Sequence, residues 1–468
     1  MTDERGLGLT SGVLPQGLPG TMKVNARGHL EIGGVDTVKL AKRYKTPLYV
    51  FDEALIRQRC REYRTAFEKN YPKFSIAYAG KAFMTMAMVR IVEEEGLYLD
   101  VVSGGELYTA LKAQFPPERI FFNGNNKSPD EIEMALRSGV GRIIVDSFDE
   151  LDLIESMAGD LKDEKGNARR VPILLRVTPG VEAHTHHYIQ TGREDSKFGF
   201  SIGAGSAMAA VMRVLASDRF DLKGIHCHIG SQLFDFEPFA ITVKKMLDFR
   251  REVYRSTGYI LHEVNFGGGL AAKYTEHDNP PSVGEFIQAL TSKVVDVCRS
   301  TDMPLPHIAV EPGRSIIAEA GTTLYTVGTV KHIPGVRTYI AVDGGMTDNP
   351  RYALYQADYR ALVANKATVP AEVHYAVAGK CCESGDMLIM DAVLPPVKPG
   401  DILAVLTTGA YCYSMASNYN RIPRPAAILV NGGVSEVIVE RETYDDLVRK
   451  DRIPARLLAK KSVVLSYH

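Results

Sequence analysis

Eight short apolar runs recur between about residues 75 and 311, and each is followed by a segment with helical periodicity. Each run ends in small, polar or charged residues, which is typical of repeated strand–helix units in a parallel sheet. The sequence therefore predicts a (β/α)8 barrel, with a doubly wound eight-stranded sheet as the alternative. The runs are FSIAYAGK, LYLDVVSGGE, RIFFNGNNK, RIIVDSFDE, PILLRVTPG, LKGIHCHIGSQ, EVNFGGG and HIAVEPGR.

The pattern changes after about residue 320, where longer β-type runs such as TTLYTVGTVKHI and AAILVNGGVSEVIVER follow one another with few helices between them. This texture indicates a β-rich second domain. Near the start, MKVNARGHLEIGG has a strand–turn–strand pattern, and we expect these strands to pack with the β-rich domain. The predicted division is N-terminal strands over 1–46, the barrel over 47–319 and the β-rich domain over 320–468.

The composition of the chain indicates which binding partners and which cellular compartment to expect. The chain has 468 residues and a formal net charge of -1, so its overall charge attracts neither nucleic acid nor an anionic membrane surface. Its six cysteines form no C-x-x-C pair, which suits a reducing compartment. There is no apolar run of membrane-spanning length and no secretory h-region, so we expect a cytoplasmic protein.

The chemistry-bearing residues fall at the predicted strand ends, where barrel enzymes build their sites. Lys81 ends an apolar strand, and partial desolvation would lower the pKa of its amine toward the range suited to Schiff-base formation, although a surface lysine is the simpler reading. Glycine turns at 267–269 and at Gly313, beside Arg314, resemble a phosphate cup, although glycines also serve ordinary tight turns.

Histidines leave a second class of enzyme open. His226 and His228 lie two residues apart on one strand and could be zinc ligands, ring-stacking partners or core histidines. With His184, His186 and His187 they suggest a metal-dependent barrel hydrolase, but amidohydrolase-type barrels place H-x-H on the first strand and the lysine later, the reverse of this order. A site without a metal is therefore preferred.

One carboxylate and one thiol each have both a catalytic and a structural interpretation. Glu311 could pair with the ring nitrogen of a cofactor or form a buried ion pair with Arg314. Cys382 lies in KCCESGD within the β-rich domain, where an inert buried cysteine is the default and catalysis the alternative.

In combination, these motifs resemble the fold III, alanine-racemase-type pyridoxal 5'-phosphate (PLP) enzymes, and most closely the diaminopimelate decarboxylase family. The resemblance covers nearly the whole chain in the expected order. One departure is YAGKAF around Lys81, where many relatives have YAVKAN, and it puts only local packing in doubt. The other motifs are DVVSGGEL, HTHHYIQTGREDSKFGF, HCHIGSQ, NFGGGL, EPGRSI, DGGMTDNPRYALY, CCESGD and GAYCYSMASNYN.

The resemblance implies a role for each matching residue. Lys81 is expected to hold PLP covalently, His228 to stack on its ring and Glu311 to bind its pyridine nitrogen, while Cys382 is the expected proton donor. The substrate's carboxylates and distal amine are expected to be bound by Arg314, Arg351, Tyr355, Glu383 and Tyr411. The remaining cofactor contacts implied are Ser231, Gly268, Pro312, Gly313, Arg314 and Tyr411.

The implied reaction is decarboxylation of meso-diaminopimelate to L-lysine and carbon dioxide, the last step of lysine biosynthesis. In this family Cys382 and Glu383 face the partner's barrel, so the resemblance implies a homodimer with shared sites. Ornithine, arginine or carboxynorspermidine is the alternative substrate on the same fold. A racemase is less favoured, and a non-catalytic relative is expected to have lost Lys81 or Cys382, both of which are present.

Overall fold

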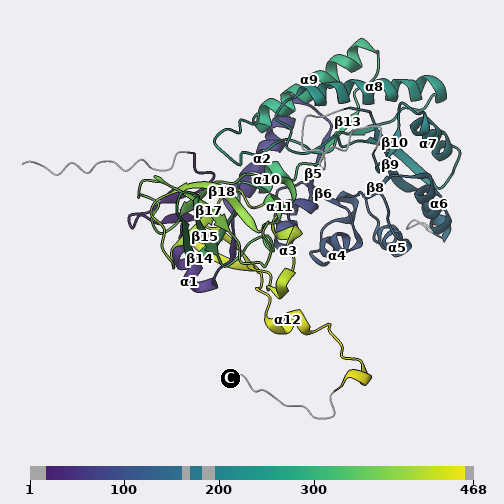
Figure 1. Ribbon diagram of the computed structural model, residues 1–468. Helices are drawn as coiled ribbons and strands as arrows, with labels where there is room; N and C mark the ends of the chain where they lie inside the picture. The colour runs from purple at the N-terminus through teal and green to yellow at the C-terminus, as the bar shows by residue number, and fades with distance from the viewer. Residues whose placement is uncertain (1–16, 161–168, 182–195, 459–468) are drawn as a thin grey trace, which may run out of the picture.

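Eight parallel strands close into a barrel, which confirms the predicted fold class (Figure 1). The computed structural model describes residues 17–160, 169–181 and 196–458. Each barrel strand pairs with the next, β8 pairs with β9, and β13 pairs with β5 to close the ring. The barrel strands are β5 (Phe74–Ala79), β6 (Tyr98–Val101), β7 (Ile120–Phe122), β8 (Arg142–Val145), β9 (Val171–Thr178), β11 (Phe220–His226), β12 (Glu263–Asn265) and β13 (His307–Val310).

Helices surround the barrel, and their first turns show why they begin where they do. Ser103, Ser128 and Ser147 each accept a hydrogen bond from the backbone N–H three residues later, which satisfies a donor that the helix itself leaves unpaired. No helix in the described ranges is long and apolar enough to cross a membrane. These helices are α2 (Glu53–Asn70), α3 (Met86–Glu94), α4 (Gly104–Lys112), α5 (Pro129–Ser138), α6 (Phe148–Met157), α7 (Ser206–Leu215), α8 (Glu237–Thr257) and α9 (Val283–Ser300).

The predicted β-rich domain follows the barrel as a second, mostly antiparallel sheet. β4 (Leu48–Asp52) also belongs to this sheet, since it pairs with β14 and β20. The predicted barrel range, 47–319, includes this strand. The domain boundaries themselves remain predictions. The other strands are β14 (Gly321–Ile333), β15 (Arg337–Val342), β16 (Ala361–Val363), β17 (Val373–Ala378), β18 (Met387–Leu394), β19 (Ile402–Val405), β20 (Ala426–Asn431) and β21 (Val434–Val439).

The N-terminal strands β1 (Lys23–Val24), β2 (Leu30–Ile32) and β3 (Val35–Asp36) form a small sheet of their own. Side chains of β2 and of α1 (Thr37–Tyr44) share one apolar cluster with β4, β14, β19 and β20. The expectation that these strands join the β-rich domain is therefore confirmed by packing.

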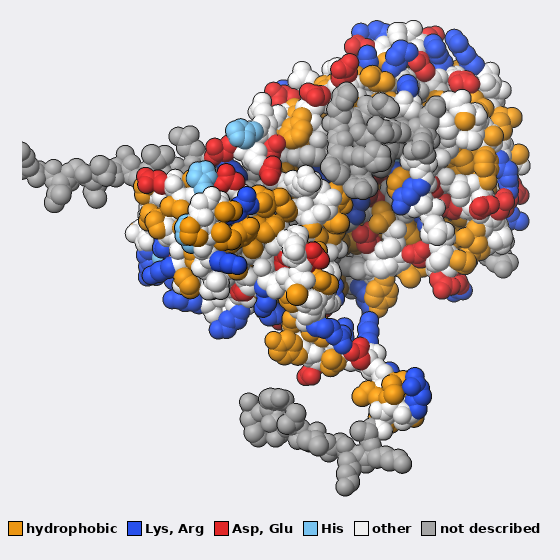
Figure 2. Space-filling model, viewed as in Figure 1, with side chains coloured by type: hydrophobic (Ala, Val, Ile, Leu, Met, Phe, Trp, Pro, Cys, Tyr) orange, Lys and Arg blue, Asp and Glu red, His pale blue; other side chains and the backbone are white. Residues whose placement is uncertain are grey.

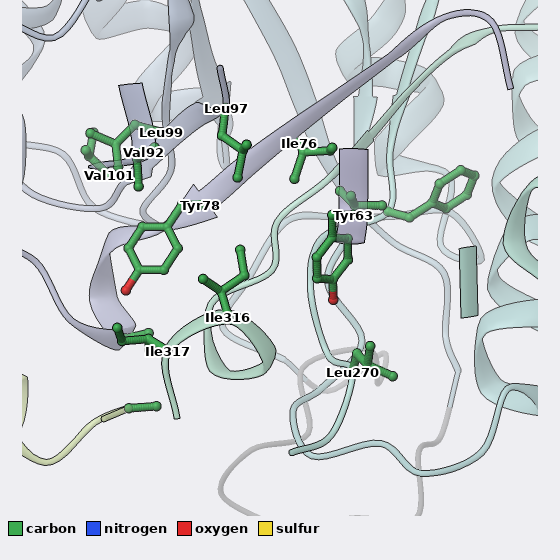
Figure 3. Packing of buried hydrophobic residues seen from close by; sticks show 14 of the residues in the cluster. Tyr63, Ile76, Tyr78, Val92, Leu97, Leu99, Val101, Leu270, Ile316 and Ile317 are labelled. Atoms are coloured by element: carbon green, nitrogen blue, oxygen red, sulfur yellow. The ribbon is translucent and has the colours of Figure 1, made fainter. Parts of the chain in front are cut away.

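One larger apolar cluster runs from the barrel helices into the β-rich domain. Figure 3 shows part of it, with Tyr78 of β5, Leu99 of β6 and Ile316 of α10 (Arg314–Ile317). The departure at YAGKAF lies at this junction. Phe83 stacks on Phe51 of β4 with ring centroids 4.1 Å apart, so the side chain in question helps to join the two domains.

Candidate active site

A cavity of about 510 Å³ opens where the barrel strands end. Its walls bring together eight of the predicted site residues from both domains. Five cationic side chains that could bind anions line this cavity: Lys81, Arg176, Lys197, Arg314 and Arg351. The predicted residues that line it are Lys81, His228, Ser231, Glu311, Arg314, Arg351, Tyr355 and Tyr411.

Lys81 lies in a short turn, Gly80–Ala82, directly after β5. The turn is held from both sides, because Ala79 N–H donates to Pro312 O and Tyr411 N–H donates to Ala82 O. A Cβ on Gly80 would lie 3.0 Å from Asp100 O and 2.8 Å from the sulfur of Met84, so the turn packs closely on β6. The lysine is therefore presented to the cavity by a well-anchored segment.

Glu311, directly after β13, is buried among three hydrogen-bond donors. Asn265 Nδ2 lies 2.8 Å and Asn123 Nδ2 lies 3.2 Å from Oε1, while His226 Nε2 lies 3.0 Å from Oε2. Burial alone would raise the pKa of Glu311, but the charge and hydrogen bond of His226, with the charge of Lys81, outweigh it and lower the pKa to about 2. The cavity thus contains a carboxylate that is ionised at neutral pH.

Two neighbouring groups have pKa values shifted toward their neutral forms. Burial, with the negative charge of Glu311, raises the pKa of Asp100 well above its usual range. Burial, with the positive charge of Lys81, lowers the pKa of His228 well below its usual range, and Gly268 N–H donates to His228 Nδ1 at 3.3 Å. An uncharged imidazole ring can stack on an aromatic ligand without a large desolvation cost.

Glycine turns after β12 and β13 bring backbone close to the cavity. A Cβ on Gly268 would lie 2.3 Å from Glu311 O, and one on Gly313 would lie 3.0 Å from the Ala79 Cβ. Both glycines line a smaller pocket beside the main cavity, together with Ser231 and Arg314. Arg314 donates to Ser231 Oγ at 2.9 Å and to the Tyr274 hydroxyl at 2.6 Å, so its guanidinium is held at this pocket.

Arg351 begins α11 (Arg351–Tyr355) and reaches the cavity from the β-rich domain. It is buried, and its guanidinium carbon lies 5.3 Å from the ring centroid of Tyr355 and 5.7 Å from that of Tyr411. Its Nε has no hydrogen-bond partner among the described residues. A buried guanidinium with an unused donor suits the bidentate binding of a carboxylate.

Cys382 and Glu383 lie outside the cavity and are exposed on the β-rich domain. Their loop is anchored by Asp386, which is buried and accepts hydrogen bonds from Cys381 N–H at 2.7 Å and from Met346 N–H at 2.6 Å. Cys382 N–H donates to Asn420 Oδ1 at 2.8 Å. Pro312 is buried in the turn after β13 and contributes its carbonyl to the Lys81 segment.

Several residues at this site were not predicted from the sequence. Asp100 lies near the end of β6, Asn123 directly after β7 and Asn265 at the end of β12. Only Asn123, which directly follows an apolar run, had a signal in the sequence. Arg176 of β9, stacked 4.1 Å from the Phe198 ring, and Tyr274 gave no comparable signal.

The metal alternative has no support in the described part of the chain, where no group of three or more His, Cys, Asp or Glu side chains could hold a metal ion. His226 instead contacts Glu311. His184, His186 and His187 lie outside the described residues.

A family model and the most similar curated proteins point to the same family. Residues 53–318 match the family model described as pyridoxal-dependent decarboxylase, pyridoxal binding domain. The chain is 52% identical over 434 residues to a diaminopimelate decarboxylase of Bacillus subtilis, covering 93% of this chain and 98% of that one. It is also 52% identical over 423 residues to a diaminopimelate decarboxylase of Bacillus methanolicus, covering 90% and 96%.

Comparison with solved structures points to the same family. The crystal structure of diaminopimelate decarboxylase from M. jannaschii in co-complex with L-lysine superposes with a TM-score of 0.86 at 36% identity, covering 94% of this chain and 99% of that chain. A lysine/ornithine decarboxylase from Vibrio vulnificus, at 21% identity and a TM-score of 0.72 over 84% of this chain and 97% of that one, shares the fold. The chain belongs to the diaminopimelate decarboxylase family of pyridoxal-dependent decarboxylases.

Proposed function

We propose that this protein decarboxylates meso-diaminopimelate to L-lysine and carbon dioxide with PLP as its cofactor. The observation that carries the proposal is the pairing, in one cavity, of the Lys81 amine with the ionised Glu311 carboxylate and a group of arginines. The 52% identity to curated diaminopimelate decarboxylases over nearly the whole chain supports the choice of substrate.

The residues present fit PLP at each of its polar ends. Lys81 supplies the amine for the aldehyde, Glu311 a carboxylate for the pyridinium N–H, and His228 a neutral ring for stacking. The glycine turns, Ser231 and Arg314 supply close backbone and positive charge for the phosphate. Gly268 and Gly313 allow this fit, since a Cβ at either position would press on neighbouring atoms.

When bound, PLP supplies an electron sink for the electron pair left at Cα as carbon dioxide departs. Glu311 supports that chemistry because three donors keep it ionised and oriented. Lys81 would hold the cofactor through its amine, which lines the cavity. Burial and the charge of Glu311 raise the pKa of Asp100, which disfavours a second negative charge next to the first.

The distal end of the substrate carries both an amine and a carboxylate. Arg351, with Tyr355 and Tyr411 around it, is positioned to bind that carboxylate, and a diamine-forming decarboxylase has no need of such a group. Glu383 would pair with the distal ammonium. This polar demand favours diaminopimelate over ornithine or arginine.

A homodimer with shared sites completes the proposal. Cys382, the proposed proton donor to Cα, and Glu383 are exposed and lie outside the cavity of their own chain. We infer that each chain presents this pair to the cavity of the second copy. Asp386 holds the loop in place through Cys381 N–H.

The direct experiment adds meso-diaminopimelate to the PLP-loaded protein and measures carbon dioxide and lysine, with Lys81→Ala as the control. Release of both products by the wild type alone is expected. A visible cofactor band without turnover of meso-diaminopimelate would rule out this substrate, and turnover by Lys81→Ala would rule out the role of Lys81.

Mixed dimers test the sharing of sites. Lys81→Ala and Cys382→Ala proteins are each expected to be inactive, whereas their mixture forms some dimers with one intact site and regains activity. An inactive mixture, despite subunit exchange shown by mass spectrometry, would contradict a site shared between chains.

A further inference from the structure

An arm formed by residues 444–458 stands away from the β-rich domain at the C-terminal end of the described chain (Figure 1). It comprises α12 (Tyr444–Val448) and a short 3-10 turn, Ala455–Leu457. No residue in the arm is buried. From Arg452 onward, the hydrogen bonds of the described arm residues all lie within the arm itself.

Large apolar side chains are concentrated on this arm. Tyr444 is 79% exposed, Ile453 67% and Val448 51%, and Leu457 and Leu458 are about equally open. In Figure 2 the projecting segment carries both hydrophobic and basic side chains. Five such side chains within fifteen residues form an apolar surface that the single chain leaves in water, which is a mark of an interaction site.

The base of the arm is fixed to the body by ion pairs. Arg424 binds Glu442 through two nitrogens, and Arg421 donates to Leu447 O at 3.0 Å and pairs with Asp451. These contacts hold the base of the arm against the segment 421–424. The exposed apolar residues of the arm follow this base along the chain.

The same anchor adjoins the loop that carries the proposed proton donor. Asn420, the neighbour of Arg421, accepts the hydrogen bond from Cys382 N–H at 2.8 Å. Cys382 and Glu383 are exposed beside it, on the face that the proposed function turns toward a second copy. The arm is thus continuous with the proposed dimer face.

A second copy also offers complementary chemistry. On the part of the barrel rim formed by α3, α4 and α5, Met86 and Tyr108 are 57% and 53% exposed. Asp130 and Glu133 of α5 are exposed acids, and Glu133 pairs with Arg137 of the same helix at 2.6 Å. The arm carries three acids and four basic residues, and its acids Asp446 and Asp451 pair with Arg449 and Arg421. Among the described residues, Lys450, Arg452 and Arg456 of the arm take part in no ion pair. Apolar and charged groups match in kind on the two surfaces.

We infer that the arm is a dimer clasp, which docks its apolar side chains on the barrel rim of a second copy of this chain. This inference rests on the shared-site dimer of the proposed function. In a two-fold symmetric dimer the contact is made twice, so its contribution to association is doubled. The clasp would hold the partner barrel against the loop that presents Cys382.

The test uses the full-length PLP-loaded protein and the triple variant Tyr444→Ser, Val448→Ser and Ile453→Ser. We expect its dimer dissociation constant, measured by sedimentation velocity over a dilution series, to rise at least about tenfold. The matched control is Val336→Ser in the β14–β15 hairpin, which is 72% exposed and should leave the constant unchanged. Because all four side chains are exposed, thermal stability should not fall in the separated monomers.

A charge exchange tests the receiving surface. Arg449→Glu with Arg452→Glu should weaken the dimer, and adding Asp130→Lys with Glu133→Lys should restore at least part of the loss. A dimer as tight in the triple variant as in the wild type, equal weakening by Val336→Ser, or no restoration by the exchange would overturn the inference.

These outcomes separate the clasp from the proposed function. A wild-type dimer that is unaffected by the arm substitutions leaves the shared site intact and removes only the clasp. A wild type that is monomeric and fully active at every concentration removes both the clasp and the sharing of sites.

Discussion

Glu311 owes its charge to its neighbours rather than to exposure. It is buried, yet both of its oxygens accept hydrogen bonds, from two amide side chains and from His226. Its folded pKa, about 2, lies below the ordinary value of 4.5. It therefore contributes stability that is fully present above pH 4.5 and is lost as the pH falls through 2. Protonation of Glu311 should not limit activity at neutral pH.

Replacing Glu311 with Gln removes the charge while keeping the shape. The amide NH2 of the glutamine would face a side chain that donates a hydrogen bond to Glu311 in the wild type. The cofactor ring would also lose its anionic partner. We expect kcat to fall on the order of 100-fold with a small change in KM, because preorganised electrostatic groups carry effects of this size. Steady-state kinetics on the PLP-saturated variant measure this, and a kcat within twofold of the wild type would contradict the assigned role.

At the scale of elements, the strand ends show what the sequence could predict. Periodicity located all eight barrel strands, and the same rule would have found Asn123, which directly follows the apolar run of β7. Asp100 lies within the apolar run of β6 and Asn265 precedes Phe266, so neither stands where an apolar run ends. The local pattern could not reveal that β4 pairs with β14 and β20, because the sequence of an apolar strand does not specify which strand it pairs with. Nor could it place Tyr274 against Arg314, because that contact depends on loop path.

The loop before α11 rests on Asp348, a buried carboxyl that accepts hydrogen bonds from Tyr325 OH and from Gly345 N–H. Burial raises the pKa of Asp348 to about 7. Between pH 4 and 7 the folded chain therefore holds a proton that the unfolded chain has lost, so this residue lowers stability as the pH rises, by at most about 1.4 kcal/mol per pH unit. Above pH 7 the loss stops growing, but the full cost remains.

Asp348→Asn should remove this pH dependence. Relative to the wild type, the variant should gain in melting temperature between pH 5 and pH 8, because its amide stays neutral while the wild-type carboxyl ionises. Thermal unfolding followed by circular dichroism at the two pH values checks the sign. A difference in melting temperature that stays constant, or that moves against the variant, would show that Asp348 is already ionised at pH 5.

The Cys382 loop depends on Asp386, and an isosteric change should separate its positioning role from stability. In Asp386→Asn one backbone N–H, of Met346 or of Cys381, would face an amide N–H and lose its acceptor. We expect a loss of about 1–3 kcal/mol in unfolding free energy and a fall in kcat with KM nearly unchanged.

The control for Asp386 is Asp401→Asn, another buried carboxylate, which accepts from Lys398 N–H at 2.9 Å and pairs with Lys366. It should lower stability by a similar amount and leave kcat alone. An equal drop in kcat in both variants would mean that the effect is general destabilisation.

At the scale of the whole molecule, the two domains share one apolar cluster. Phe83, two residues beyond Lys81, stacks on Phe51 of β4 and lies with its ring centroid 5.7 Å from that of Tyr413. The position that departs from many relatives is therefore part of the contact between barrel and β-rich sheet. A junction built this way ties the cofactor lysine to the stability of both domains.

Because the core is continuous, the barrel and the β-rich domain should unfold together. Phe83→Ala removes a ring that is 1% exposed, and large-to-small changes of this kind cost about 3–5 kcal/mol. In urea we expect one transition at a lower midpoint, with far-UV circular dichroism, which reports both domains, coinciding with the cofactor absorbance, which reports the barrel. If the two signals separate in the wild type, the domains unfold independently and the junction contributes less than its burial indicates.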